Sequence, residues 1–336
     1  MTVSVDTAVT EKLQEVDFIH LHNHSQFSVL QSTMSVKQLV DAAAKERMPA
    51  VALTDHANMM GAFHFVREVN TYNRSIQEDI ENTELDEALK PKAIKPILGC
   101  EFFVCDDHTN KNQKHYGYQI VMLAKNKNGY QNLAKMSSIA YTDGFYYVPR
   151  IDRKVVETYK EDIIVLSGNL YGEVPSKILN VGENQATEAL LWWKEQFGDD
   201  FYIELMRHGQ EDEDRVNPVL IRLAKEHDVK LVASNNTYYA EKENANAHDI
   251  LLCVKDGEKQ ATPIGRGRGY RYGLPNQEYY FKSGDEMKSL FKDHPEAIVN
   301  IQEVVDKVEA FELARDVLLP KFDIPSKFIH EEDDED

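Results

Sequence analysis

The chain has 336 residues, 42% of them hydrophobic, so it is long enough to bury one large core or two smaller ones. No stretch approaches eighteen consecutive apolar residues, and residues 1–15 lack the order of a signal peptide, so we expect a cytoplasmic protein without a membrane span. Acidic residues outnumber basic ones by 57 to 38, and the net charge of −19 argues against close DNA binding by this chain alone.

Apolar runs rich in β-branched and aromatic residues alternate with amphipathic stretches along the chain. Residues 35–47 and 186–197 carry apolar side chains on one face, as crossover helices do. This alternation is typical of an α/β fold with a largely parallel sheet, and it favours a barrel over a sandwich. The predicted strands are residues 16–22, 49–55, 96–104, 118–124, 163–167, 201–206 and 230–235.

Other segments interrupt or follow this alternation. Residues 75–92 are strongly acidic, and we interpret them as a solvated helix or loop inserted at the barrel rim. After Lys255 comes a loop rich in Gly, Arg and Tyr, followed by two predicted helices at residues 284–291 and 294–311. We therefore divide the chain into an N-terminal extension (1–15), a barrel (16–260), a loop and helical extension (261–317) and an acidic linker (318–336).

Side chains that can bind metal cluster at the ends of predicted strands, where parallel α/β barrels place their active sites. His20, His22 and His24 alternate along the first strand, so they should point to one side. His56 follows the second strand and Glu101 ends the third. Imidazoles and a carboxylate that converge in this way can bind a divalent cation.

An ordinary structural role is the alternative for each histidine taken alone. A single histidine at a strand end is more often hydrogen-bonded than metal-bound, and we apply this interpretation to His64, His208 and His248. The H-x-H-x-H run followed by His56 and Glu101 is much rarer by chance. For that set we favour a site that descends from a metal centre.

Several sequence motifs resemble a known family. HLHNHSQFS, TDHANMMGAF and KPILGCEFFV are similar to the first three motifs of the PHP (polymerase and histidinol phosphatase) superfamily. NGYQNLAKMSSIAY, GFYYVPRIDR, VLSGNLYGEVP, HDILLCVKDG and NQEYYFKSGDEM resemble segments of the DNA polymerase III alpha subunit family. The resemblance runs from about residue 18 to about residue 317 and implies a PHP-type distorted (β/α)7 barrel with a short C-terminal extension.

The resemblance also implies a set of metal ligands, of which only part is retained. His22 and His24 match the first motif, His56 the second and Glu101 the third. The other positions carry neutral or weaker groups. Gln31 replaces an aspartate, Gln119 a histidine and Asn169 a cysteine or histidine, while Asn236 and Tyr238 replace the aspartate and histidine of the last motif.

These replacements weaken the expected chemistry. An amide oxygen binds metal less strongly than a carboxylate, and it lacks the charge or basic nitrogen that zinc prefers. We therefore expect no ion or one weakly bound divalent ion (Zn or Mn) at His22, His24, His56 and Glu101, without efficient hydrolysis. His208 follows the sixth strand and is the best candidate for a substitute ligand.

The loop that contains GRGRGY, residues 265–270, admits two interpretations. Its composition suits a single-strand contact or a partner-binding loop, but a flexible connection whose arginines offset nearby acids is the more ordinary explanation. It is not a dinucleotide-binding fingerprint, because no βαβ unit follows.

The resemblance implies a role in DNA replication. It suggests a non-catalytic scaffold domain that contacts the other domains of the polymerase alpha subunit, the proofreading exonuclease and other replisome components, and that meets DNA only through the full-length protein. Nucleotidyl transfer with Mg²⁺ would belong to a later domain. The alternatives are a metal-dependent phosphoesterase or 3′–5′ exonuclease that uses the barrel site, and an interaction module with a vestigial pocket.

Overall fold

The fold was analysed in a computed structural model, which describes residues 13–314 apart from 14, 82–85, 87–89, 113, 115 and 266. Nearly all of the predicted N-terminal extension and all of the predicted linker at 318–336 lie outside the described residues. The strands are β1 (Ala50–Leu53), β2 (Lys95–Cys105), β3 (Tyr118–Ala124), β4 (Arg150–Asp152), β5 (Ile163–Leu166), β6 (Phe201–Met206) and β7 (Lys230–Ser234). The helices are α2 (Val36–Lys45), α3 (Ala62–Ser75), α4 (Gln77–Glu81), α5 (Lys127–Thr142), α6 (Arg153–Tyr159), α7 (Glu173–Asn180), α8 (Glu183–Phe197), α9 (Glu211–Glu226), α10 (Ala245–Asp256), α11 (Gly284–Leu290) and α12 (Glu296–Asp306).

The strands form one curled, mixed sheet in the order β1-β2-β3-β5-β6-β7, with β4 paired to the end of β2. Four neighbouring pairs are parallel, in line with the predicted largely parallel sheet: β1–β2, β2–β4, β5–β6 and β6–β7. β3 instead runs antiparallel to both β2 and β5. The connection from β2 to β3 contains no helix among its described residues, so the chain reverses directly. β4 was not predicted, because three residues are too few to show a periodic pattern.

The prediction of a first strand at residues 16–22 is wrong, although the segment occupies the expected place. The backbone N–H of Ala52 donates to His20 O (3.0 Å), and Thr237 N–H donates to His22 O (3.1 Å). The segment therefore joins the β1 edge of the sheet to the chain that follows β7, and it closes the distorted barrel. A regular ladder is interrupted because the Asn23 side chain donates to the carbonyls of His20 and Ala52.

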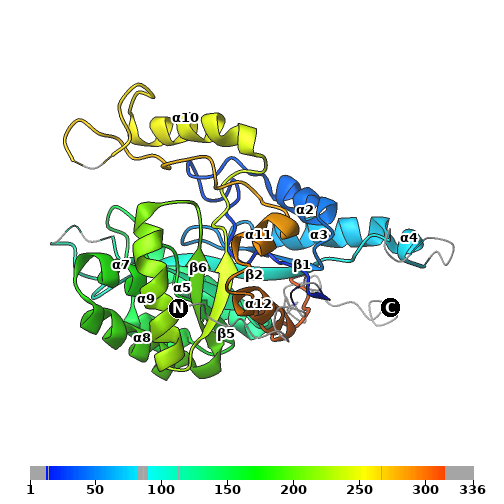
Figure 1. Cartoon of the computed structure of the whole chain (residues 1–336), viewed down its shortest axis with the longest axis horizontal. Coiled ribbons are helices and arrows are strands. Elements are labelled where there is room, and N and C mark those ends of the chain that lie inside the picture. Colours follow the sequence, from blue (N-terminus) through cyan, green and yellow to red (C-terminus); the bar gives the residue numbers. More distant parts are fainter. Residues whose placement is uncertain are drawn as a thin grey trace, which may run out of the picture.

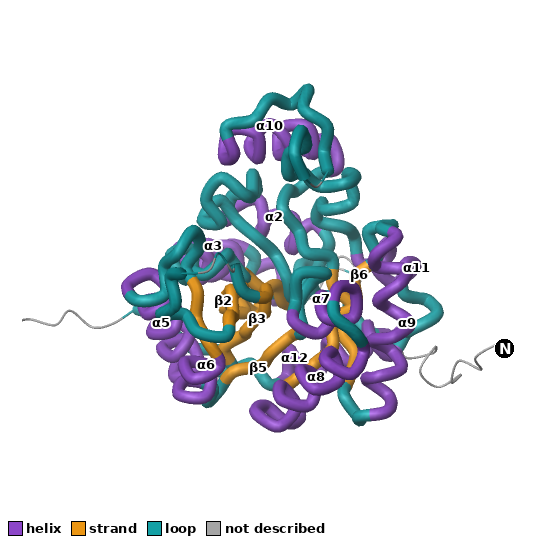
Figure 2. Tube along the Cα trace, turned by 90° about the vertical axis from the view of Figure 1, so that its left-hand side faces the viewer, coloured by secondary structure: helices purple, strands orange, loops and turns teal. Residues whose placement is uncertain are grey.

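Helices surround the sheet and provide its cover (Figure 2). α12 packs against β7, and the Asn300 amide donates to Leu231 O (2.9 Å). α8 buries Trp193, whose indole N–H donates to Glu173 Oε2 (2.8 Å). α10 and the loop after it stand above the barrel mouth, apart from the other helices (Figure 1).

The helices predicted from periodicity are confirmed with small changes in their bounds. Residues 35–47 form α2, which Ser35 caps by accepting from Gln38 N–H, and residues 186–197 lie in α8. The two predicted C-terminal helices are α11 and α12. The acidic insertion contains α4 in its described part. No helix among the described residues is long and apolar enough to cross a membrane.

Gly168 shapes the turn that brings Asn169 to the barrel mouth. We expect Gly168→Ala to lower the free energy of unfolding by more than backbone strain alone, which costs about 1–3 kcal/mol. Its φ is +83°, and an added Cβ would lie 2.1 Å from the carbonyl oxygen of Gln119. Urea unfolding would measure the loss.

Gly209→Ala is the matched control for this substitution. Gly209 also has a positive φ (+73°), but an added Cβ would have no heavy atom within 4 Å. Gly209→Ala should therefore show the cost of backbone strain alone, and equal losses in the two variants would contradict the steric argument.

Candidate metal centre

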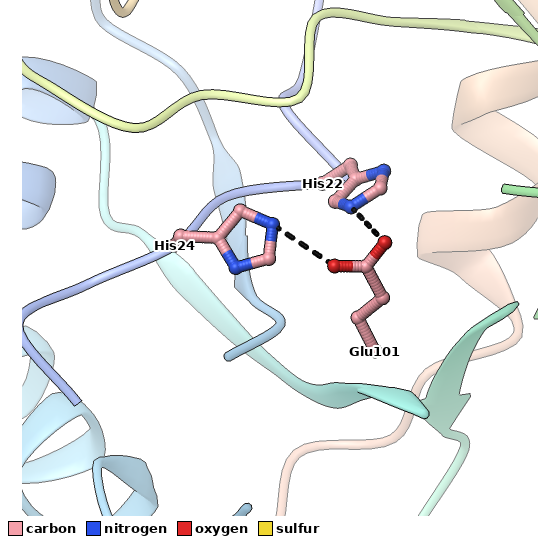
Figure 3. Close-up of side chains that lie close together, drawn as sticks. All are labelled: His22, His24 and Glu101. Atoms are coloured by element: carbon pink, nitrogen blue, oxygen red, sulfur yellow. Dashed lines mark ion pairs between the residues drawn. The ribbon is translucent and has the colours of Figure 1, made fainter. Parts of the chain in front are cut away.

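Two histidines and one carboxylate meet at the barrel mouth (Figure 3). His22 and His24 come from the extended segment beside β1, and Glu101 comes from β2. His22 Nε2 lies 3.7 Å from Glu101 Oε1, and His24 Nε2 lies 3.3 Å from Glu101 Oε2. All three side chains are fully buried. The structure thus brings together these three predicted ligands.

Glu101 was predicted to lie at the end of its strand. It does not, because β2 continues to Cys105. It lies three residues beyond the end of the β1 pairing, opposite His56, with which it forms a parallel bridge. Continued pairing with β3 and β4 keeps β2 extended beyond the site. The carboxylate therefore faces the mouth from the middle of a long strand.

His56 joins the same group, and His20 does not. His56 Nδ1 lies 2.8 Å from Glu101 Oε2, and its ring stacks on that of His24 with centroids 4.1 Å apart. His20 Nε2 instead lies 2.8 Å from Lys282 O, and its ring contacts Phe281. The prediction that His20 points to the same side as His22 and His24 is wrong, because it assumed a regular strand and the segment does not form one.

The charges of the group favour a cation at its centre. Burial would raise the pKa of Glu101, but the imidazoles of His56, His22 and His24 hold it well below its usual range. Burial would lower the pKa of His22, but Glu204 and Glu101 raise it to about 10. Burial, reinforced by His56, lowers the pKa of His24 to about 3. A metal ion would take the place of the proton that His22 holds at neutral pH.

The ligand atoms of His22, His24 and Glu101 lie close enough together to hold one divalent ion. Two atoms that share a tetrahedral ion at bond lengths of about 2.0–2.1 Å lie roughly 3.3–3.5 Å apart, close to the separations of His22 Nε2 and His24 Nε2 from Glu101. His22 Nε2 is buried and makes no hydrogen bond within the described part of the chain, while the buried His56 Nδ1 and Glu101 Oε2 form an ion-pair contact of 2.8 Å that lacks hydrogen-bond geometry. Buried polar atoms without partners are costly, and a bound ion would satisfy them.

Amides and a phenol occupy the neighbouring positions at which the sequence resemblance implies further ligands. The Asn169 amide donates to Glu101 Oε1 (3.2 Å) and to Gln119 Oε1 (2.8 Å). Asn236 Oδ1 lies 3.1 Å from His24 Nε2, and the Tyr238 ring stacks on His24 with centroids 4.5 Å apart. These side chains contact the retained ligands and provide hydrogen bonds where the family pattern has charged or basic groups.

Gln31 and His208 lie outside the group of retained ligands. The carbonyl of Gln31 is 2.8 Å from His248 Nε2, and its Oε1 accepts from Lys255. His208 Nδ1 is 2.6 Å from Glu213 Oε1, and its Nε2 is 2.5 Å from Asn235 O. Both ring nitrogens of His208 therefore have partners, which does not favour His208 as a substitute ligand.

Glu204, which was not predicted as a site residue, lies behind His22. Its Oε1 is 2.9 Å from His22 Nδ1, and the side chain is fully buried. Ser234 Oγ also donates to Glu204 Oε1. The available signal was a single acidic residue within the apolar strand FYIELM, since a buried carboxylate requires a partner.

The candidate centre lies within a segment that matches a known protein family. The model of the PHP domain matches residues 20–208, more than half of the chain. The chain belongs to the PHP domain family. The match contains His22, His24, His56 and Glu101, and it therefore covers the whole candidate centre.

Several curated relatives of this PHP domain are DNA polymerase III alpha subunits. That of Borreliella burgdorferi is 37% identical over 93% of this chain and 25% of the relative. That of Campylobacter jejuni is 36% identical over 86% of this chain and 23% of the relative. The chain thus spans about a quarter of the length of these relatives.

Solved structures show a weaker likeness. A putative metal-dependent phosphoesterase from Bifidobacterium adolescentis covers 82% of this chain and 96% of its own, with a TM-score of 0.40 and 12% identity. That similarity is too low to bear on function.

Proposed function

We propose that this PHP domain is the scaffold domain of a bacterial replicative DNA polymerase alpha subunit. The observation that carries the proposal is the 37% identity to such a subunit over 93% of the chain. The similarity extends past the PHP match at residue 208 and so includes α10, α11 and α12 in its span. Because the chain spans about a quarter of these relatives, polymerisation itself is assigned to sequence outside it.

The chemistry of the barrel mouth supports a scaffold role over a catalytic one. The Asn169 amide donates to both Glu101 and Gln119, so neutral amides stand where a multinuclear site needs anionic or basic ligands. We propose that the centre holds one divalent ion, zinc or manganese, at His22, His24, His56 and Glu101. A single ion held without a neighbouring base is poorly suited to activate water.

The scaffold would act through its partners. These are the other domains of the polymerase, the proofreading exonuclease and further replisome components in the cytoplasm, with DNA contacted only through the full-length protein. Size-exclusion chromatography of the chain mixed with the exonuclease subunit tests the docking role. Co-elution is expected, and separate elution from every replisome component would contradict it.

The isolated chain is expected to synthesise no DNA, with or without Mg²⁺. Its acidic surface disfavours a primer–template, and the polymerising domain would lie in the part of the relatives that the chain does not span. Primer extension with purified protein and all four deoxynucleotides measures this. The full-length polymerase is the positive control, and extension by residues 1–336 alone would refute the assignment.

The second candidate is a metal-dependent phosphoesterase or 3′–5′ exonuclease that uses the barrel site. His22 Nε2 favours it, because this buried atom makes no hydrogen bond among the described residues and lies 3.7 Å from Glu101 Oε1, where an ion could bind. Elemental analysis combined with a chromogenic phosphate-ester assay separates the two functions. Stoichiometric metal with activity that His22→Ala abolishes would support the enzyme, and metal without activity would support the scaffold.

A further inference from the structure

Each of the two histidines that face Glu101 is held from behind by a second carboxylate. His22 contacts Glu204, and His24 contacts Asp55 through Ser28. The group of ligand atoms that could hold one ion consists of His22, His24 and Glu101 and contains neither Glu204 nor Asp55. The contacts of Glu204 and Asp55 determine which ring nitrogen of His22 and His24 carries the hydrogen.

For His22 the assignment follows from one contact. An ionised carboxylate only accepts hydrogen bonds, so Glu204 Oε1 at 2.9 Å requires a hydrogen on His22 Nδ1. Ser234 Oγ and the backbone keep the glutamate in place, since Ser234 Oγ donates to Oε1 and Glu204 N–H donates to Ser167 Oγ (2.9 Å). Because Nδ1 faces Glu204, Nε2 is the atom of His22 that is free to bind an ion on the Glu101 side.

For His24 the assignment passes through a hydroxyl. Ser28 Oγ donates its one hydrogen to Asp55 Oδ1 (2.7 Å), so it can only accept from His24 Nδ1 at 3.1 Å. Asp55 is held as an acceptor by Ser25, whose N–H and hydroxyl both donate to it. His24 Nε2 is then bare. The Asn236 amide lies 3.1 Å from it and can rotate to present its NH₂ group.

We propose that Glu204 and the Ser28–Asp55 pair are positioning residues that hold His22 and His24 as Nε2 ligands of one divalent ion. Both Nε2 atoms then point toward Glu101 (Figure 3). Because both imidazoles already carry their hydrogen on Nδ1, binding an ion requires no change of tautomer at His22 or His24. This would favour cation binding by a centre that has few ligands. This inference rests on the proposed single-ion centre, and it is independent of the docking role.

Zinc titration of the whole chain tests the proposal. Glu204→Gln keeps the shape of the side chain but removes its charge, so a neutral amide oxygen, which is a weaker acceptor, faces His22 Nδ1 and Ser234 Oγ. The Kd for Zn²⁺, measured by calorimetry, is expected to rise about 10–100-fold. ¹⁵N NMR of histidine-labelled, zinc-loaded protein should show His22 and His24 bound through Nε2 in the parent, with the His22 signature altered in Glu204→Gln.

A matched control separates positioning from folding. Glu213→Gln changes another buried carboxylate–imidazole pair, with His208 Nδ1 at 2.6 Å, that lies outside the ion-binding group. It should reduce stability without changing the Kd for Zn²⁺. If Glu204→Gln does not fold, Ser28→Ala tests the same principle at His24, and Ser28→Thr, which retains the hydroxyl, should restore affinity.

The outcomes are distinct. A parent-like Kd and unchanged His22 resonances in Glu204→Gln would overturn the positioning role. Equal losses of affinity in Glu204→Gln and Glu213→Gln would also overturn it, because they would reflect stability alone. Absence of zinc binding by the parent would overturn this inference together with the single-ion centre, while co-elution with the exonuclease would still decide the scaffold role separately.

Discussion

Replacing Glu101 with glutamine is expected to lower the free energy of unfolding at neutral pH by about 3 kcal/mol. The carboxylate is fully buried among His22, His24 and His56, and its loss leaves the positive charge of the group uncompensated on that side. The estimate lies at the low end of the usual range of about 3–5 kcal/mol, because Glu204 still pairs with His22.

Urea unfolding of Glu101→Gln beside Glu157→Gln measures this effect. Glu157 is exposed on α6, so its substitution should change stability by no more than about 0.5 kcal/mol. Glu101→Gln should also abolish zinc binding, since the one carboxylate of the proposed ligand set is gone. A variant as stable as the parent would show that the imidazoles do not depend on this carboxylate.

Much of the fold was predictable from local pattern. Periodicity located six of the seven strands, β1, β2, β3, β5, β6 and β7, because buried strands of four or more apolar residues leave a clear signal. Strand direction did not follow from that signal, and β3 proved to be antiparallel. Direction depends on whether a connection crosses the sheet or reverses, which is a tertiary property.

The candidate site was predictable where the residues lie at positions fixed by neighbouring strands. His22, His24, His56 and Glu101 converge as expected, because the extended segment, β1 and β2 lie side by side. His20 diverged, since Asn23 interrupts the regular pairing on which strand parity depends. Glu204 escaped notice, because its partner His22 is distant in sequence and only the closure of the barrel joins them.

Introducing an aspartate at position 236 and a histidine at position 238, where the family resemblance implies metal ligands, should add metal-binding capacity to the centre. In Asn236→Asp/Tyr238→His, a carboxylate would replace the amide that lies 3.1 Å from His24 Nε2, and an imidazole would replace the phenol whose hydroxyl lies 3.5 Å from His56 Nε2. A charged oxygen and a basic nitrogen are the donors that zinc and manganese prefer. We expect elemental analysis of the variant to show more bound metal per chain than in the parent.

The variant should also depend on metal for its stability. Without an ion, a new carboxylate in this buried site loses its hydration and has only imidazoles such as that of His24 beside it, so the metal-free variant should unfold at lower urea than the parent. Saturating zinc or manganese at about 100 times Kd should then add about 2.7 kcal/mol, which chelation removes. Asn246→Asp, on the exposed surface of α10, is the control and should show neither effect. Unchanged metal content in the double variant would contradict the view that Asn236 and Tyr238 replaced metal ligands, because the surrounding imidazoles and Glu101 would still be in place to share an added ion.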